Sequence, residues 1–224
     1  MINEKLTEQG LYNPDFEHDA CGVGFVAHIK GQKSHQQVSD ALTMLENMEH
    51  RGACGCDPES GDGAGIMIQL PHEFLWEECI SLGIQLEEPG YYGTGMLFLP
   101  KEAELNKLCR DTIMEAAAER NLTFLGFRPV PVCRDGIGVT ALSAEPEIVQ
   151  FFVSRPDDVV NTEDFERKLF VLRRLIIQKI KEHQEYPLPL YIASLSCKTI
   201  IYKGQLTTYQ VGSYFKDLQD PRVV

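Results

Sequence analysis

Apolar residues recur along this chain at two spacings, which predict two kinds of element. Between residues 35 and 50, apolar residues from Val38 to Met48 follow one another at steps of three and four, as on one face of a helix. The runs GVGFVAHI, residues 22–29, and IMIQLP, residues 66–71, are short and rich in small or β-branched residues, as buried strands are. We therefore expect a strand, a helix and a second strand in this order.

The same alternation continues to the end of the chain. Helical spacing predicts helices over residues 72–83, 101–121 and 161–184, and Asn161 or Thr162 is placed to cap the last of these. Strand-like runs occupy residues 94–100, 124–132, 147–156, 190–196 and 198–204. Two pairs of strands are adjacent in the sequence, which favours antiparallel pairing. This pattern favours an α+β fold or a layered sandwich over a doubly wound sheet.

Composition narrows the classes of partner. The 224 residues are 43% hydrophobic, and no run approaches the roughly 18 apolar residues of a membrane helix. The net charge of −12, with no basic stripe, opposes a nucleic-acid partner. Seven cysteines form an odd set without regular spacing, and residues 1–20 lack the features of a secretory signal, so we expect a reduced, cytoplasmic protein.

Two loop motifs have residue types found in binding sites. The glycines of residues 61–65 precede a strand and no Lys-Ser/Thr follows them, whereas phosphate-binding glycines open a helix, so we expect a tight loop with close backbone approach. Cys54 and Cys56 are too close together for the usual zinc knuckle, and no second pair accompanies them. The sequence thus predicts neither a metal nor a cofactor in this chain.

Cys21 and Arg51 have ordinary interpretations when each is taken alone. An unpaired cysteine is usually a small buried hydrophobic residue, and an arginine at the end of a helix commonly binds the last carbonyls. Residues 1–20, which precede Cys21, are either a disordered arm or a pro-segment. If they were removed, Cys21 would carry a free α-amine beside its thiol, and the amine, with a pKa near 7.7–8.0, could take the thiol proton. One residue would then supply both nucleophile and base.

Cys-Gly-Val-Gly-Phe, the helix that follows and MEHRGACGCDPESGDGAGI together resemble the N-terminal glutaminase domain of glutamate synthase large subunits. That domain is a class II glutamine amidotransferase with the N-terminal-nucleophile αββα sandwich fold. The resemblance extends through the whole chain, including NPDFEHDAC and LYIASLSCKTIIYKGQL, and Ser60 stands where the family has threonine. It implies a pro-segment at residues 1–20 and an amidotransferase domain from residue 21 to residue 224.

The resemblance also implies roles for single residues. Cys21, freed by cleavage after Ala20, would attack the side-chain amide of L-glutamine, and Arg51, the arginine of the His-Arg-Gly motif, would line the substrate site. The ammonia would pass to a synthase domain of the full-length chain, which uses 2-oxoglutarate, FMN, an iron–sulfur cluster and NAD(P)H or ferredoxin. No cofactor is expected within this chain, while an electron-donor subunit and a homo-oligomer are conceivable partners.

The C-terminal end departs from the family pattern. Family members continue into a His-Ser-Arg-Phe segment that holds glutamine and an Asn-Gly pair that forms the oxyanion hole, and neither is found before Val224. Loss of one such donor costs about 10²–10³ in rate, so we expect a truncated domain with little activity alone. The alternatives are an N-terminal cysteine hydrolase of another amide and a non-catalytic fragment that binds a partner.

Overall fold

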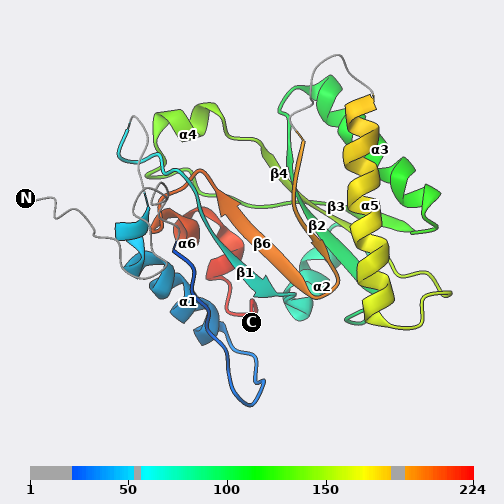
Figure 1. Cartoon of the computed structure of the whole chain (residues 1–224), viewed down its shortest axis with the longest axis horizontal. Helices are drawn as coiled ribbons and strands as arrows, with labels where there is room; N and C mark the ends of the chain where they lie inside the picture. The colour runs from blue at the N-terminus through cyan, green and yellow to red at the C-terminus, as the bar shows by residue number, and fades with distance from the viewer. Residues whose placement is uncertain (1–21, 53–56, 183–189) are drawn as a thin grey trace, which may run out of the picture.

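The structure is a computed structural model that describes residues 22–52, 57–182 and 190–224. The four-stranded sheet carries α3 and α5 on one face, and the two-stranded sheet packs against α1 and α6 (Figure 1). The helices are α1 (His35–Asn47), α2 (His72–Ser81), α3 (Ala103–Glu119), α4 (Val139–Ser143), α5 (Thr162–Glu182) and α6 (Gln210–Tyr214), with short 3₁₀ turns η2 (Glu49–Arg51) and η3 (Lys216–Gln219). The strands are β1 (Ala64–Gln69), β2 (Tyr92–Leu99), β3 (Phe124–Pro129), β4 (Glu147–Ser154), β5 (Tyr191–Ser196) and β6 (Thr199–Gly204).

All pairings between these strands are antiparallel. One sheet has the order β3-β4-β2-β5, and the other pairs β1 with β6. A short turn at Cys197 and Lys198 connects β5 to β6 and carries the chain from one sheet to the other. The expected α+β sandwich is therefore confirmed.

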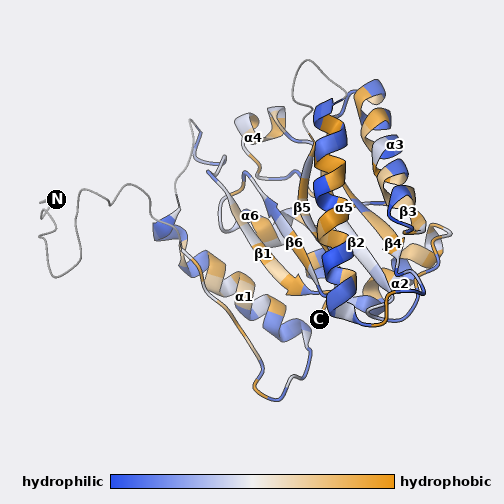
Figure 2. Ribbon diagram, turned by 45° about the vertical axis from the view of Figure 1, so that its right-hand side comes forward, coloured by the Kyte–Doolittle hydropathy of each residue, from blue (hydrophilic) through white to orange (hydrophobic). Residues whose placement is uncertain are grey.

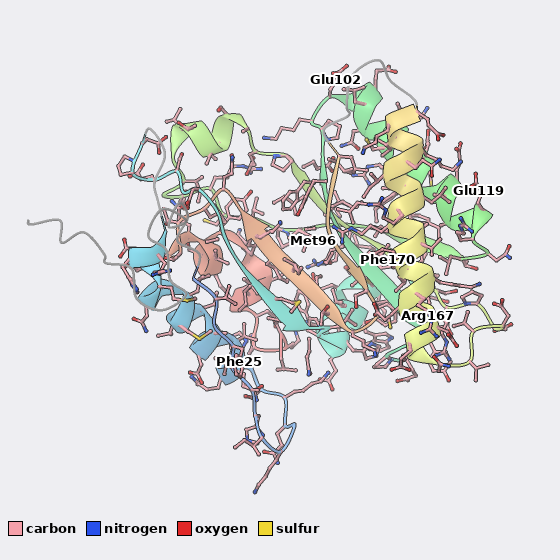
Figure 3. All side chains as sticks on the ribbon, in the orientation of Figure 1. Phe25, Met96, Glu102, Glu119, Arg167 and Phe170 are labelled. Atoms are coloured by element: carbon pink, nitrogen blue, oxygen red, sulfur yellow. The ribbon has the colours of Figure 1, made fainter. Side chains whose placement is uncertain are left out.

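The apolar core has two parts, one on each side of the four-stranded sheet. Along β4, Ile148 and Phe152 belong to the core between the sheets, while Phe151 and Val153 belong to the core under α3 and α5. Met96 of β2 is fully buried between the sheets (Figure 3). Because both faces of the sheet are covered, the run EIVQFFVS is almost continuously apolar, and Figure 2 shows apolar residues along the strands of both sheets.

Local signals account for the start of α5, the longest helix in the described part of the chain. The backbone N–H of Asp164 donates to Asn161 Oδ1 at 2.9 Å, so Asn161 caps α5. Glu163 and Asp164 lie in its first turn, where carboxylates stabilise the positive end of the helix dipole. The prediction of a capped helix here is confirmed.

No helix in the described ranges is both long and apolar enough to cross a membrane.

The prediction of a buried strand at residues 22–29 is wrong. The segment is extended beside α1, but it has no ladder partner among the described residues. Val23 is 92% exposed and Phe25 is 89% exposed, and Figure 3 shows Phe25 outside the two sheets. The apolar composition of the run is real, but a strand also needs a neighbour that pairs with its backbone, and the run itself does not encode one.

Candidate functional site

A pocket of about 880 Å³ opens between the end of α1, the start of β1, the start of β5 and the end of β6. The first wall carries Met48 and Arg51, the second carries Asp62 and Gly63, and the third carries Lys203. Segments from opposite ends of the sequence thus meet around one opening, because the antiparallel pairing of β1 with β6 aligns the beginning of one strand with the end of the other.

Gly22 and Arg51 meet at the first wall. A Cβ atom placed on Gly22 would lie 3.2 Å from Arg51 Cβ and 3.2 Å from Met48 Sδ, so the chain passes close against the end of α1 and η2. Gly52, which follows Arg51, is extended and ends the 3₁₀ turn. Cys21 itself lies outside the described residues, but its direct neighbour in the sequence packs on Arg51 at this pocket.

The glycine-rich loop forms the second wall, and it is a tight loop as expected. A Cβ atom on Gly61 would lie 2.1 Å from the backbone oxygen of Leu206, and Gly63 has a φ of +140°, which side-chain-bearing residues rarely adopt. Gly65 lies opposite Lys203 in the β1–β6 ladder. The glycines therefore serve close approach of backbone to backbone.

Lys203 and Tyr191 form the third wall, and neither was recognised from the sequence. Lys203 Nζ donates to the Tyr191 hydroxyl at 2.5 Å and lies 4.5 Å from the centre of the tyrosine ring. Strand periodicity offered a signal, since Lys203 shares a face of β6 with Ile201, which also lines the pocket. The pocket thus combines the cations of Arg51 and Lys203 with the carboxylate of Asp62.

The buried cysteines of the structure are poor nucleophiles. Burial raises the pKa of Cys79 to about 12 and that of Cys109 to about 11. The pKa of Cys197 is also raised to about 12, by burial and by its contact with Glu166. These thiols stay protonated at neutral pH. No group of three or more His, Cys, Asp or Glu side chains that could hold a metal ion occurs in the described part of the chain, whereas Cys54 and Cys56 lie outside it.

Comparison with known proteins decides the family. The sequence model of the class-II glutamine amidotransferases matches residues 21–224. The chain belongs to the class-II glutamine amidotransferases. The match begins at Cys21 and includes Arg51, the glycine-rich loop and strands β5 and β6.

Several glutamate synthases are similar to this amidotransferase chain. The glutamate synthase [NADPH] large chain of Bacillus subtilis is 40% identical over 222 residues, which cover 99% of this chain and 14% of the relative. The glutamate synthase [NADH] of Schizosaccharomyces pombe is 40% identical over 221 residues, or 96% of this chain and 10% of the relative. The ferredoxin-dependent glutamate synthase 2 of Synechocystis is 38% identical over 205 residues, or 92% and 13%. The chain thus spans about a seventh or less of the length of these relatives.

Of the two site residues predicted from the sequence of this amidotransferase, the structure describes Arg51 but not Cys21. Arg51 lines the pocket, and its role in binding substrate stays a prediction. Cys21 and the pro-segment of residues 1–20 lie outside the described residues, so their roles stay predictions. The contact between Gly22 and Arg51 joins the two motifs in space, although they are about thirty residues apart in sequence.

Proposed function

We propose that this chain carries the nucleophile and part of the substrate site of an enzyme that hydrolyses the side-chain amide of L-glutamine, with Cys21 as the nucleophile and Arg51 as a substrate-binding residue. The observation that carries the proposal is the packing of Gly22 against Arg51 at the pocket, with 3.2 Å between Arg51 Cβ and a Cβ placed on Gly22. A residue joined directly to Gly22 starts within reach of the same opening. The start of the family match at Cys21 supports the same assignment.

The reaction needs the free α-amine of Cys21. Removal of residues 1–20 turns the Cys21 amide into an amine. The ordinary pKa of an α-amine, about 7.7–8.0, is close to neutral pH, so the amine can take the proton of the thiol. The thiolate attacks the amide carbon of glutamine, the amine returns its proton to the departing nitrogen, and ammonia leaves. Water then cleaves the γ-glutamyl thioester, releasing glutamate and restoring the thiol.

The charges of the pocket suit a free amino acid. The guanidinium of Arg51 and the ammonium of Lys203 complement the α-carboxylate of glutamine, and an arginine can bind a carboxylate through two parallel hydrogen bonds. The carboxylate of Asp62 complements the α-ammonium group. A peptide-bound glutamine lacks both charges, so free glutamine is the preferred substrate.

The wider role is also a proposal. The ammonia would serve glutamate synthesis from 2-oxoglutarate by a synthase domain outside this chain. FMN, an iron–sulfur cluster and NAD(P)H or ferredoxin would serve that domain, and an electron-donor subunit or a second copy of the protein are its proposed partners. The relatives are named for NADPH, NADH or ferredoxin. We propose a cytoplasmic location, which agrees with the free thiols of Cys79, Cys109, Cys133 and Cys197.

One experiment tests cleavage and activity together. Intact mass spectrometry reports whether residues 1–20 are removed, and a coupled assay measures glutamate released from glutamine. Both are run on the chain and on a version extended at its C-terminal end with the corresponding sequence of the Bacillus subtilis relative. The expected result is loss of residues 1–20 and glutamate release in the extended version, with no release after Cys21→Ser.

The matched substrate control is asparagine, whose side chain is one methylene shorter, together with a peptide containing glutamine. A processed, extended protein that releases no glutamate and is not labelled at Cys21 by a glutamine-like diazoketone contradicts the proposal. Faster hydrolysis of asparagine or of the peptide than of free glutamine also contradicts it, because it assigns the pocket to another amide.

A further inference from the structure

The loop of residues 57–61 caps a helix that is remote in sequence. Helix α4 begins after Gly138, and no side chain of its own caps it. Instead, the backbone N–H of Thr140 donates to Asp57 Oδ2 at 3.2 Å, and that of Ala141 donates to Ser60 Oγ at 3.0 Å. The Ser60 hydroxyl in turn donates to Asp57 Oδ2 at 3.0 Å. We call this arrangement the Asp57–Ser60 clamp.

The clamp fits closely against the start of α4. A Cβ atom on Gly138 would lie 2.0 Å from Asp57 Oδ1 and 2.4 Å from Ser60 Oγ, so glycine alone leaves room for both side chains. The backbone N–H of Gly138 also donates to the Glu59 carbonyl at 2.9 Å. Ser60 is only 4% exposed. Loop and helix are thus held along several successive residues.

A buried glutamine ties the same loop to a third segment. Gln210 Nε2 donates to the carbonyl of Glu59 at 2.7 Å and to that of Gly136 at 2.8 Å. Gln210 Oε1 accepts a hydrogen bond from the Thr207 backbone N–H at 2.8 Å. The loop is thereby fixed both to the approach to α4 and to the connection between β6 and α6.

The residues fixed in this way continue directly into the pocket. Ser60 and Gly61 precede Asp62 and Gly63, which line the second wall. Gln205 and Thr208 also line the pocket, and they flank Leu206, against whose backbone Gly61 packs. A shift of the clamped loop would therefore move two parts of the pocket wall together.

We infer that Asp57 and Ser60 are positioning residues, which hold the wall of residues 62–65 in the place where it receives glutamine. This inference rests on the proposed function. Neither residue lines the pocket, so both act through the loop they anchor. A displacement of about 1 Å can cost up to 10²-fold in rate when reacting groups must be aligned.

The test separates positioning of the substrate from reactivity of the thiol. Processed protein with Cys21 at its N-terminus is treated with a glutamine-like diazoketone, which must occupy the pocket, or with iodoacetamide, which needs only an accessible thiolate. Ser60→Ala and Asp57→Asn are expected to slow labelling by the diazoketone about ten- to a hundredfold, while labelling by iodoacetamide and the melting temperature change little. Ser60→Thr keeps the hydroxyl and is expected to restore the rate.

Ser143→Ala is the matched control, because it removes a hydroxyl from the other end of α4, where Ser143 Oγ donates to the Thr140 carbonyl. If both variants keep the wild-type rate with the diazoketone, the inference is overturned. The inference is also overturned if labelling by the two reagents slows equally, or if the variants unfold. Either result would show a purely structural role for the two residues. A wild-type protein that shows no preference for the diazoketone overturns the proposed function instead.

Discussion

Arg128 and Arg51 show two opposite uses of the same charged side chain. The Arg128 side chain is 3% exposed and forms two parallel hydrogen bonds with Asp217, both at 2.8 Å. Arg51 is exposed and lies at the edge of an open pocket. The first cation lies in the core, whereas the second lies at the surface of the pocket. A buried ion pair stabilises the fold, and an exposed cation at a pocket lies within reach of a ligand.

The surroundings of Arg128 complete its pairing. Its Nη1 atom also donates to Gln150 Oε1 at 3.0 Å, and the Tyr202 hydroxyl donates to Asp217 Oδ2 at 3.0 Å. Burial lowers the pKa of Arg128, but hydrogen bonding and charge attraction by Asp217 outweigh that effect and raise it. Burial and the neighbouring Asp217 carboxylate raise the pKa of Tyr202. Arg128 therefore stays charged and Tyr202 stays neutral at ordinary pH.

The largest expected effect comes from breaking the buried pair. Asp217→Asn removes the buried countercharge of Arg128 and leaves only the partly exposed Glu78, whose Oε2 lies 3.3 Å from Arg128 Nη2; breaking a buried pair typically destabilises a protein by about 3–5 kcal/mol. Urea denaturation measures the free energy of unfolding. The double variant Arg128→Met/Asp217→Leu removes both charges and is expected to recover most of the loss. A single variant that is as stable as the wild type would show that the pair does not support the fold.

The next effect concerns Arg51 at the edge of the pocket. Arg51→Ala is expected to lower glutamate release about 10²-fold, or about 2.7 kcal/mol in activation free energy, while the free energy of unfolding changes by less than about 0.5 kcal/mol. Kinetics and urea denaturation of the same sample give both numbers. Arg51→Lys is the matched control. It should recover only part of the rate, because lysine keeps the positive charge but cannot bind a carboxylate through two parallel hydrogen bonds. A variant with normal kinetics and lowered stability would assign Arg51 to the fold.

The smallest effect is a pH dependence at a third charged site. Burial raises the pKa of Glu145, but hydrogen bonds from Lys101, Tyr214 and Arg134 outweigh it, so the pKa is lowered from its ordinary value of 4.5. The folded state thus binds this proton less readily than the unfolded state. The stabilisation is fully present above about pH 5 and declines as the pH falls below 4.5 toward the folded-state pKa.

Glu145→Gln tests that assignment. The variant is expected to lose about 1–2 kcal/mol at pH 7 and to show a weaker loss of stability between pH 5 and pH 3 than the wild type. Thermal or urea unfolding across this range provides the measurement. Parallel stability curves for the two proteins would mean that other carboxylates carry the acid sensitivity.

The contrast also explains what could be predicted from the sequence. Helix α5 and its cap at Asn161 depend on residues within one turn, so local pattern was sufficient. Arg128 and Asp217 are 89 positions apart, and the local sequence around each residue does not predict that they pair. The error at residues 22–29 has the same origin, since burial of a strand depends on what lies next to it.

The candidate site was reached by two routes. Arg51 was ambiguous from spacing alone and was found through the resemblance of its motif to a family. Lys203 and Tyr191 were missed, because only the pairing of β6 with β1 and of β5 with β2 brings them to the pocket. Sequence pattern thus gave the layers of the fold, whereas the wall of the pocket required tertiary structure.

Gly61 and Gly138 have a consequence for how the chain can vary among its relatives. The irregular loop that carries Gly61 looks like a region free to change, and Pro58 and Glu59 are indeed exposed. At Gly61 and Gly138, however, the first carbon of any side chain would meet backbone or clamp atoms within 2.1 Å. Both glycines are buried, so these two loop positions should tolerate replacement as poorly as the core does, and sequence variation in this loop should concentrate on the exposed Pro58 and Glu59.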